Sequence, residues 1–365
     1  MKSEEKQLFL QLCRFRDEGF DRALLQYASP AVLGHLFFNR MQAAAYGVLK
    51  QQKALGLVSR EFRNSLRDAW EKNREKNQSF FRCVEGLARL LAGCGFPAAM
   101  LKGALLCSLY PEGYRTANDV DLLVMQKDVT ALGELLTAAG FIQGYIRNGE
   151  LVPASRREII ESRMMRGETV PYIREVNLPS LQYLEVDVNF SIDYKNGSEV
   201  LLKAMLERTT CREVGKIRIP TLCAEDFLIH LCGHLHKEAS TLPWVQMKRD
   251  MTLYKFADIY LLLGKMSPKE ISEMFGRAGE LEMEKVCAGA VLQTAELFGL
   301  KETFILEPAR RILKDDKNWM HRVISPADNK TYVYRTKSLS DRLFMEDREK
   351  NLREEKKNAD TCHER

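Results

Sequence analysis

Residues 183–193, with the sequence YLEVDVNFSID, alternate strictly between apolar and polar side chains. Side chains of a β-strand point alternately to its two faces, so a period of two predicts a strand with one buried face. The polar face of this strand carries Glu185, Asp187, Asn189 and Ser191. The chain therefore contains a β-sheet that presents carboxylates on one of its faces.

A second strand is predicted at residues 118–125, NDVDLLVM, from its β-branched and aliphatic residues. Asp119 and Asp121 are two positions apart, so they share one face, and aliphatic side chains take the other. Two aligned carboxylates suit a hard divalent cation such as Mg²⁺, which prefers oxygen ligands. An Asp-x-Asp pair alone is weak evidence, because such pairs also occur at ordinary strand ends. If the two strands are neighbours, however, Asp119, Asp121 and Asp187 converge on one site.

The segments around the second strand indicate a small α/β unit. Residues 98–103 are predicted to form a short apolar strand that ends in glycine, and residues 104–113 a short helix or turn. An amphipathic helix is predicted at 129–141. Residues 142–180 are rich in Arg and Glu, and they are compatible either with a hairpin or with an excursion over the site.

The predicted fold class is α+β, with an α/β core between two helical regions. The small mixed sheet of the core holds three strands, with the Asp-x-Asp strand beside the Asp187 strand: residues 98–102, 119–125 and 184–192. Four regions follow from the changes in pattern along the chain: an N-terminal helical region (1–95), the α/β core (96–220), a C-terminal helical domain (221–328) and a charged tail (329–365). We expect the tail to be a solvated helix or disordered.

Composition excludes several classes of protein. The net charge is only +5 over 365 residues, which is too small an excess for a dedicated binder of duplex DNA but allows an anionic ligand. No apolar run approaches the ~20 residues of a membrane span, and the N-terminal segment does not have the pattern of a signal peptide. The nine cysteines show no Cys-x-x-Cys spacing. We therefore expect reduced thiols and a cytoplasmic protein without a membrane partner.

A phosphate-binding turn is predicted one helix upstream of the Asp-x-Asp strand. Gly103 follows a short strand, so the backbone there can approach a phosphate, and the N-terminus of the next helix favours an anion. Arg115 lies four residues before Asp119, within reach of a triphosphate.

These residues carry a family resemblance. The stretch LKGALLCSLYPEGYRTANDVDLLV (101–124) resembles the core motif of bacterial nucleotidyltransferases of the DNA polymerase beta-type superfamily. The segment YLEVDVNFSI is similar to the strand that carries the third carboxylate of that superfamily, and TLCAEDFLIHLCGHLHK (221–237) is similar to a helix that follows. The resemblance covers roughly 96–265. The superfamily usually has Gly-Gly or Gly-Ser at the turn, whereas this chain has Gly103-Ala104 and so lacks one hydroxyl that could contact a phosphate.

The resemblance implies transfer of a nucleoside monophosphate from a nucleoside triphosphate to a hydroxyl acceptor, which could be a small molecule, a protein or RNA. Two Mg²⁺ or Mn²⁺ ions would be held by Asp119 and Asp121. Asp187 would hold the catalytic ion and help to deprotonate the acceptor. The nucleotide phosphates would be bound by the turn and by two cations: Lys102, Gly103, Ala104 and Arg115. We rank Arg115 above Lys102, whose side chain could point away from the turn.

Two other functions stay open at this point. A non-catalytic scaffold with a degenerate nucleotide pocket is favoured by Ala104, but the three intact carboxylates count against it. A glycosyltransferase could use the Asp-x-Asp pair to hold a nucleotide-sugar diphosphate, but it would need a parallel-sheet domain before that pair. The helical pattern of the first 95 residues counts against this second alternative.

Two further clusters have weaker interpretations. His230 and His234 share a helical face and could bind zinc together, although packing is the favoured role of these residues and of His236. The second cluster could bind a nucleotide or nucleic acid, but a solvated helix face is favoured: Trp244, Lys248, Arg249 and Lys255. An intrahelical pair is expected between Lys255 and Asp258.

Overall fold

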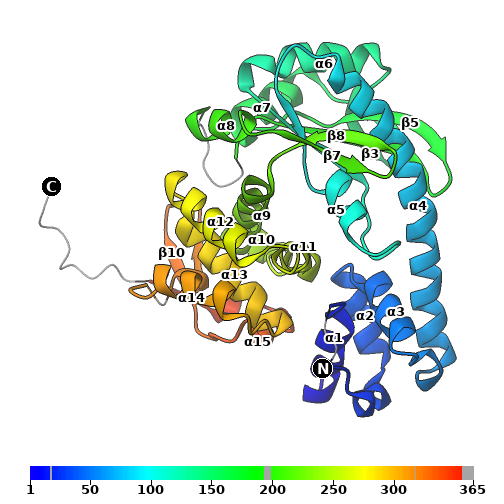
Figure 1. Ribbon diagram of the computed structural model, residues 1–365, viewed down its shortest axis with the longest axis vertical. Coiled ribbons are helices and arrows are strands. Elements are labelled where there is room, and N and C mark those ends of the chain that lie inside the picture. Colours follow the sequence, from blue (N-terminus) through cyan, green and yellow to red (C-terminus); the bar gives the residue numbers. More distant parts are fainter. Residues whose placement is uncertain (17–18, 193–198, 317, 356–365) are drawn as a thin grey trace, which may run out of the picture.

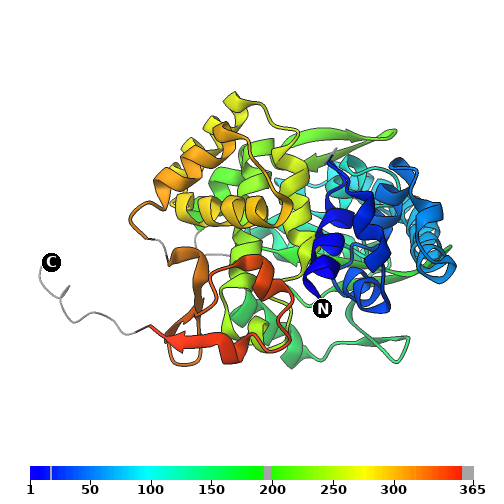
Figure 2. The same ribbon diagram turned by 90° about the horizontal axis from the view of Figure 1, so that it is seen from below.

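The computed structural model describes residues 1–16, 19–192, 199–316 and 318–355. A sheet with its covering helices forms one end of the molecule, and two groups of helices from the two ends of the chain form the rest (Figure 1). The view in Figure 2 shows the N-terminal helices beside the C-terminal ones. The predicted α+β class, with a mixed sheet flanked by helices, is confirmed.

The central sheet has six strands in the order β1-β2-β6-β5-β3-β4. Its strands are β1 (Ala98–Met100), β2 (Asp119–Val124), β3 (Ile142–Arg147), β4 (Glu150–Pro153), β5 (Tyr172–Leu178) and β6 (Leu181–Asn189). Strands β2 and β6 are parallel, and every other neighbouring pair is antiparallel. The predicted placement of the Asp-x-Asp strand beside the Asp187 strand is therefore correct.

Residues 142–180 contain the hairpin that was one of the two interpretations of this segment. Strands β3 and β4 form the hairpin, the helix α7 (Arg156–Arg166) follows, and β5 returns to the sheet beside β6. Ser155 caps α7. Its hydroxyl accepts a hydrogen bond from the backbone N–H of Glu158, and the Glu158 carboxylate accepts one from the backbone N–H of Ser155.

The N-terminal region is helical, as predicted. It consists of α1 (Ser3–Cys13), α2 (Pro30–Phe38), α3 (Gln42–Gln51) and α4 (Arg60–Ala92), with short 3-10 turns at Arg22–Tyr27 and Leu55–Leu57. Helix α4 has 33 residues, which corresponds to about 50 Å at 1.5 Å per residue. It runs from the N-terminal helices along the side of the sheet, so it joins the two parts of the molecule (Figure 1).

The remaining helices flank the sheet or form the C-terminal group. Helices α5 (Gly103–Leu109), α6 (Val129–Ala138) and α8 (Glu199–Leu206) belong to the core, together with a hairpin of β7 (Thr210–Val214) and β8 (Ile217–Thr221). The C-terminal group contains α9 (Ala224–Ala239), α10 (Leu242–Gln246), α11 (Leu253–Leu263), α12 (Pro268–Glu280), α13 (Glu284–Phe298) and α14 (Thr303–Ile312).

The prediction of a solvated or disordered tail is wrong for residues 329–355. Strands β10 (Thr331–Tyr334) and β11 (Leu352–Glu354) form a three-stranded sheet with β9 (Arg322–Ile324), and α15 (Leu339–Leu343) lies between them in sequence. Charge patterning missed this segment because its buried contacts are few and specific: Arg348 is buried on Asp250, and Leu339 and Leu343 join the core. Residues 356–365, including Cys362, lie outside the described residues.

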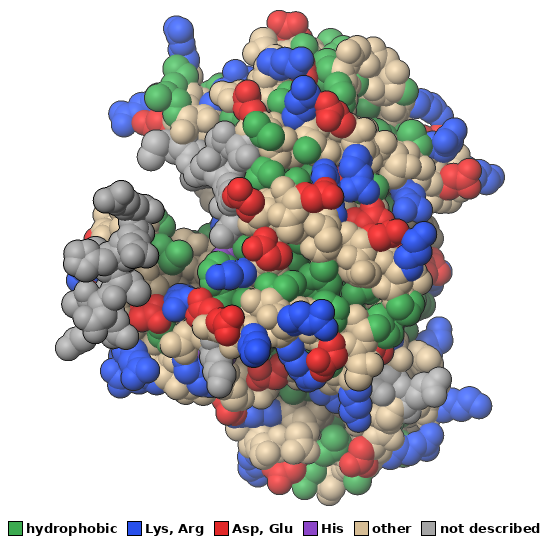
Figure 3. All heavy atoms as spheres, turned by 60° about the vertical axis from the view of Figure 1, so that its left-hand side comes forward, with side chains coloured by type: hydrophobic (Ala, Val, Ile, Leu, Met, Phe, Trp, Pro, Cys, Tyr) green, Lys and Arg blue, Asp and Glu red, His purple; other side chains and the backbone are tan. Residues whose placement is uncertain are grey.

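The main cluster of buried apolar side chains includes residues from all four predicted regions. The boundaries of those regions therefore stay a prediction. The described cysteines are free thiols and mostly buried, as expected. Within the described residues, none of the helices has the length and apolar character needed to cross a bilayer. On the face drawn in Figure 3, Lys and Arg side chains are interspersed with Asp and Glu.

Candidate active site

The register of β2 and β6 aligns the predicted carboxylates. Asp121 lies directly opposite Asp187, and Asp119 lies opposite Glu185. Neighbouring strands are about 4.8 Å apart, so the Asp121 and Asp187 side chains leave the sheet next to each other on the same face. The apolar residues of β6 take the other face and are fully buried: Leu184, Val186 and Val188. The sheet thus brings together the three aspartates that the sequence placed on two separate strands.

These carboxylates are crowded and largely removed from water. Burial, followed by the charges of Asp121 and Asp119, raises the pKa of Asp187 from 3.8 to about 9. The pKa values of Asp119 and Glu185 are also raised, in each case first by burial and then by neighbouring carboxylates. A group of acids whose pKa values rise together carries negative charge that the protein itself does not fully compensate.

Lys102 turns toward the aspartates. Its ammonium nitrogen lies 3.1 Å from Oδ1 of Asp121. The expectation that Lys102 could point away, which ranked it below Arg115, is therefore wrong. Its backbone has φ +35°, in the left-handed region, where a residue with a Cβ is strained. The ammonium group neutralises part of the charge of Asp121 directly.

Gly103 and Ala104 occupy different environments. Gly103 lines the cavity at the site, and a Cβ there would meet the carbonyl oxygen of Asp119 at 3.0 Å, so only glycine fits without a shift. Ala104 is fully buried and is not among the cavity-lining residues. A hydroxyl at position 104 would therefore point into the core, and the Ala104 side chain takes no part in the site.

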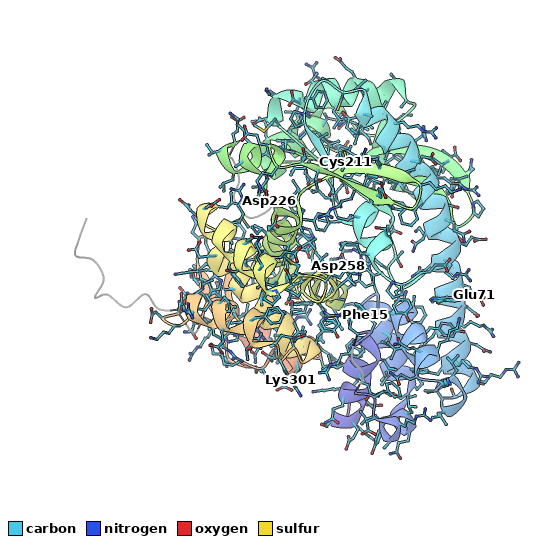
Figure 4. The ribbon with its side chains drawn as sticks, viewed as in Figure 1. Phe15, Glu71, Cys211, Asp226, Asp258 and Lys301 are labelled. Atoms are coloured by element: carbon cyan, nitrogen blue, oxygen red, sulfur yellow. The ribbon has the colours of Figure 1, made fainter. Side chains whose placement is uncertain are left out.

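Arg115 lines the same cavity, but its guanidinium is already engaged. Its Nε and Nη2 donate to the two carboxylate oxygens of Asp258 on α11, at 2.9 and 3.0 Å. The ring of Tyr254 lies 4.9 Å from the guanidinium carbon. Asp258 lies on the side of α11 that faces α5 (Figure 4). The Arg115 guanidinium, which the sequence predicted to bind a triphosphate, thus holds the segment before β2 against the C-terminal helices.

Helix α4 also holds that segment, a role that the sequence analysis missed. Asn73 donates to the carbonyl oxygen of Gly113 at 3.3 Å, and Asn77 donates to the carbonyl oxygen of Arg115 at 2.9 Å. Lys76 contacts the amide oxygen of Asn118. Asn73 and Asn77 are buried, which is unusual for Asn on a helix. Four-residue spacing of Asn within an apolar stripe is the signal that could have drawn attention to them.

The site opens into a cavity of about 570 Å³, a size typical of small-molecule sites. Its lining comes from the end of α2, the turn before α5, the segment before β2, the β2–β6 face, Glu168 and helices α9 to α11. The basic cluster predicted as a solvated face also lines it: Trp244, Lys248, Arg249 and Lys255. The prediction of a solvated helix face is therefore wrong, because these side chains line the same cavity as the carboxylates.

The histidines and the predicted helical ion pair are also placed. His234 lines the cavity, with Nε2 3.3 Å from the Glu238 carboxylate. His236 stacks on Trp319 in the interior, which agrees with a packing role. The expected pair of Lys255 with Asp258 is replaced by two pairs between different helices or segments: Lys255 with Glu238, and Arg115 with Asp258.

The donor set fits a hard divalent cation. Asp119, Asp121 and Asp187 offer carboxylate oxygens on one face, and the raised pKa values show that this charge is under-compensated. In the described part of the chain, no three His, Cys, Asp or Glu side chains are positioned to hold one metal ion as they stand. Metal binding would therefore require the carboxylates to turn toward one another and Lys102 to leave Asp121.

A parallel pair of strands thus aligns three aspartates on one face, and Gly103 lines the same cavity. The model of a family described as uncharacterised nucleotidyltransferase matches residues 31–299, and the chain belongs to that family. Among solved structures, the chain is similar to an antigenic nucleotidyltransferase-like protein from Paracoccidioides brasiliensis. The identity is 15%, the match covers 56% of this chain and 90% of that chain, and the TM-score is 0.33, too low to establish a common fold. The comparison with curated proteins gives no match.

The raised pKa of Asp187 predicts a pH-dependent stability in the presence of a chelator. The folded state holds the Asp187 proton more tightly than the unfolded state, so stability is greatest below pH 4 for this group and is lost as pH rises toward 9. Asp187→Asn should remove this loss. At pH 8 the variant should be more stable than wild type by at least about 1.4 kcal/mol, the equivalent of one pKa unit.

The measurement is urea denaturation of both proteins at pH 5 and pH 8 in EDTA. If the variant were destabilised equally at both pH values, the folded state would not raise the pKa of Asp187, and the prediction would be wrong.

Proposed function

We propose that the protein is a metal-dependent nucleotidyltransferase, which transfers a nucleoside monophosphate from a nucleoside triphosphate to a hydroxyl acceptor. The observation that carries this proposal is the parallel register that sets Asp121 opposite Asp187, one position from Asp119 on the same face. Family membership supports a nucleotide as the substrate.

In the proposed reaction the acceptor oxygen forms a bond to the α-phosphorus. The bond from that phosphorus to the oxygen that bridges it to the β-phosphate breaks, and pyrophosphate leaves with the electron pair. The Asp187 carboxylate takes the proton of the hydroxyl. Asp119, Asp121 and Asp187 would hold two Mg²⁺ or Mn²⁺ ions, which when bound would supply neutralising charge at the attacking and leaving oxygens and lower the pKa of the surrounding carboxylates.

The turn before α5 contributes the close approach to the nucleotide. Gly103 has no Cβ, so the turn packs closely against the carbonyl oxygen of Asp119, and its backbone N–H groups would bind a phosphate oxygen in the cavity that Gly103 lines. Lys102 would move from Asp121 to the phosphates when the charge of the aspartates is otherwise compensated. Reactions of this kind depend on position and on charge neutralisation more than on covalent steps of the protein.

The two alternatives fare differently. Membership of a nucleotidyltransferase family counts against a glycosyltransferase. A non-catalytic scaffold was suggested by Ala104, but Ala104 is buried away from the cavity, so the absence of a hydroxyl there is no sign of a degenerate site.

The test is a nucleotide screen. Each of the four nucleoside triphosphates, labelled at the α-phosphate, is incubated with the protein, Mg²⁺ or Mn²⁺, and cell extract as the source of acceptors. We expect release of pyrophosphate together with transfer of the label, and loss of both in EDTA. A protein that binds triphosphates but releases no pyrophosphate with any nucleotide, metal or extract would be the scaffold instead.

A further inference from the structure

Basic residues with a strained backbone gather at the cavity. In the described part of the chain, nine residues other than glycine have a positive φ: Arg40, Lys53, Lys102, Asn148, Asn177, Ser180, Lys248, Glu282 and Asn329. Of these, Arg40, Lys102 and Lys248 line the cavity. All three are basic, and residues with a strained backbone cluster at active sites and ligand clamps, where the surrounding structure holds the backbone in that conformation.

Arg40 and Lys248 occupy the same position in two unrelated helix ends. Lys248 follows α10, with its N–H bonded to the carbonyl of Val245, while the N–H of Arg249 bonds to the carbonyl of Trp244. The end of α2 repeats this pattern around Arg40, with φ +57°. The position normally favours glycine, which has no Cβ to strain in the left-handed region. Two long basic side chains therefore stand where glycine would be the easier residue.

A nearby residue with buried contacts ties each position to the rest of the fold. Asn39, next to Arg40, accepts a hydrogen bond from the backbone N–H of Leu253 at 3.0 Å, which ties α2 to α11. Asp250 follows Lys248 and Arg249 and is bonded by Arg348, at 2.7 Å, and by the hydroxyl of Tyr334. The backbone beside each strained residue is thus anchored at the cavity.

The cavity is lined by charges of both signs on both sides, but the two carboxylates on its helical side, Glu238 and Asp258, are ion-paired with Lys255 and Arg115. Asp119, Asp121 and Asp187 lie on the sheet, while Arg40, Lys248 and Arg249 lie on the helical side. These three basic residues form no ion pair within the residues that the structure describes, and all three are exposed. A ligand that carries divalent cations against the aspartates and negative charge against Arg40, Lys248 and Arg249 would compensate both groups.

We propose that Arg40, Lys248 and Arg249 form a phosphate-binding wall that takes the triphosphate of the nucleotide. This inference rests on the proposed function and deepens it. A complex of a nucleoside triphosphate with divalent cations has the required separation of charge. The wall supplies the cationic contacts that the sequence predicted at Arg115, whose guanidinium is bonded to Asp258.

Glycine substitutions separate a ligand contact from a structural role. Arg40→Gly and Lys248→Gly remove the charge but also relieve the backbone strain, so neither should unfold the protein. Lys53→Gly is a matched control, because Lys53 has φ +51° at the end of α3, with the same pair of capping bonds, but does not line the cavity. All three variants should have a melting temperature equal to or higher than that of wild type.

Calorimetric titration with a nonhydrolysable triphosphate and Mg²⁺ tests the wall. The Arg40→Gly/Lys248→Gly double variant should bind the triphosphate and pyrophosphate at least about tenfold more weakly, since contacts to charged groups are the strong ones. The affinity for a nucleoside monophosphate should change less than twofold. Lys53→Gly should bind every ligand as wild type does.

The outcomes separate the inference from the function on which it rests. Equal triphosphate affinity of wild type and the double variant overturns the wall, even if transfer to the acceptor falls, because the wall would then serve the acceptor. A wild-type protein that binds no triphosphate with Mg²⁺ overturns the proposed function itself. A loss in the Lys53→Gly control of the same size as in the double variant also overturns the wall.

Discussion

Replacement of Asp121 with Asn is expected to abolish nucleotidyl transfer while the protein stays folded. Asp121 lies at the centre of the acidic face, opposite Asp187 and bonded by Lys102. The amide keeps the shape of the side chain but removes one negative ligand, and metal-assisted charge stabilisation is worth several kcal/mol. We expect a loss of at least about 10³-fold in kcat/KM, since each ~1.4 kcal/mol corresponds to a factor of ten.

The matched control lies on the same face of the sheet. Glu185→Gln makes the same change of charge on β6, opposite Asp119, at a residue that has no assigned role in the reaction. It should retain most of the activity. Circular dichroism and the melting temperature in EDTA should show that Asp121→Asn is folded and no less stable than wild type, because the change relieves repulsion among the carboxylates. If Asp119→Asn and Asp121→Asn both turned over as wild type does, the carboxylate assignment would be wrong.

The parts of the site that follow from a period of two could be predicted from the sequence. Alternation fixes which residues of a strand share a face, so Asp119 with Asp121, and Asp187 with Glu185, were placed correctly before their strands were paired. The matched polar faces of the two strands suggested the pairing itself. Burial of one face then fixes the register, because a slip of one residue would turn the carboxylates into the core.

Other parts of the site depend on contacts between segments far apart in the sequence, and no periodic pattern of residues predicts them. Arg115 and Asp258 are 143 positions apart, and the sequence suggested a helical neighbour for Asp258 instead. The bond from Asn77 of α4 to the segment before β2 is equally remote. Left-handed backbone at Lys248 could not be predicted either, since a helix end of this type normally signals itself by glycine. These are the features that shape the cavity beyond its aspartates.

Removal of the Arg115 side chain is expected to lower the free energy of unfolding by about 3–5 kcal/mol, the usual result of breaking one side of a buried ion pair. The Arg115 and Asp258 side chains are 13% and 5% exposed, so solvent screens the pair little. Arg115→Ala leaves the Asp258 carboxylate buried without its cationic partner, although the hydroxyl of Tyr110 still donates to it at 2.9 Å. Urea denaturation measures the loss, and the Arg115→Ala/Asp258→Ala double variant should recover part of it, because no orphaned charge remains.

The same double variant decides what Arg115 does for the nucleotide. If Arg115 made a bidentate contact with the leaving pyrophosphate, as its place before Asp119 suggested, the double variant would lose about ten- to a hundredfold in triphosphate affinity. The geometry favours a clamp, since both donors of the fork are bonded to Asp258. We therefore expect the folded double variant to bind a nonhydrolysable triphosphate within about twofold of wild type, the range of a contact worth less than ~1 kcal/mol. A larger loss of triphosphate affinity, measured where the double variant is fully folded, would show that Arg115 belongs to the phosphate site. Its guanidinium would then have to leave Asp258 when the nucleotide binds.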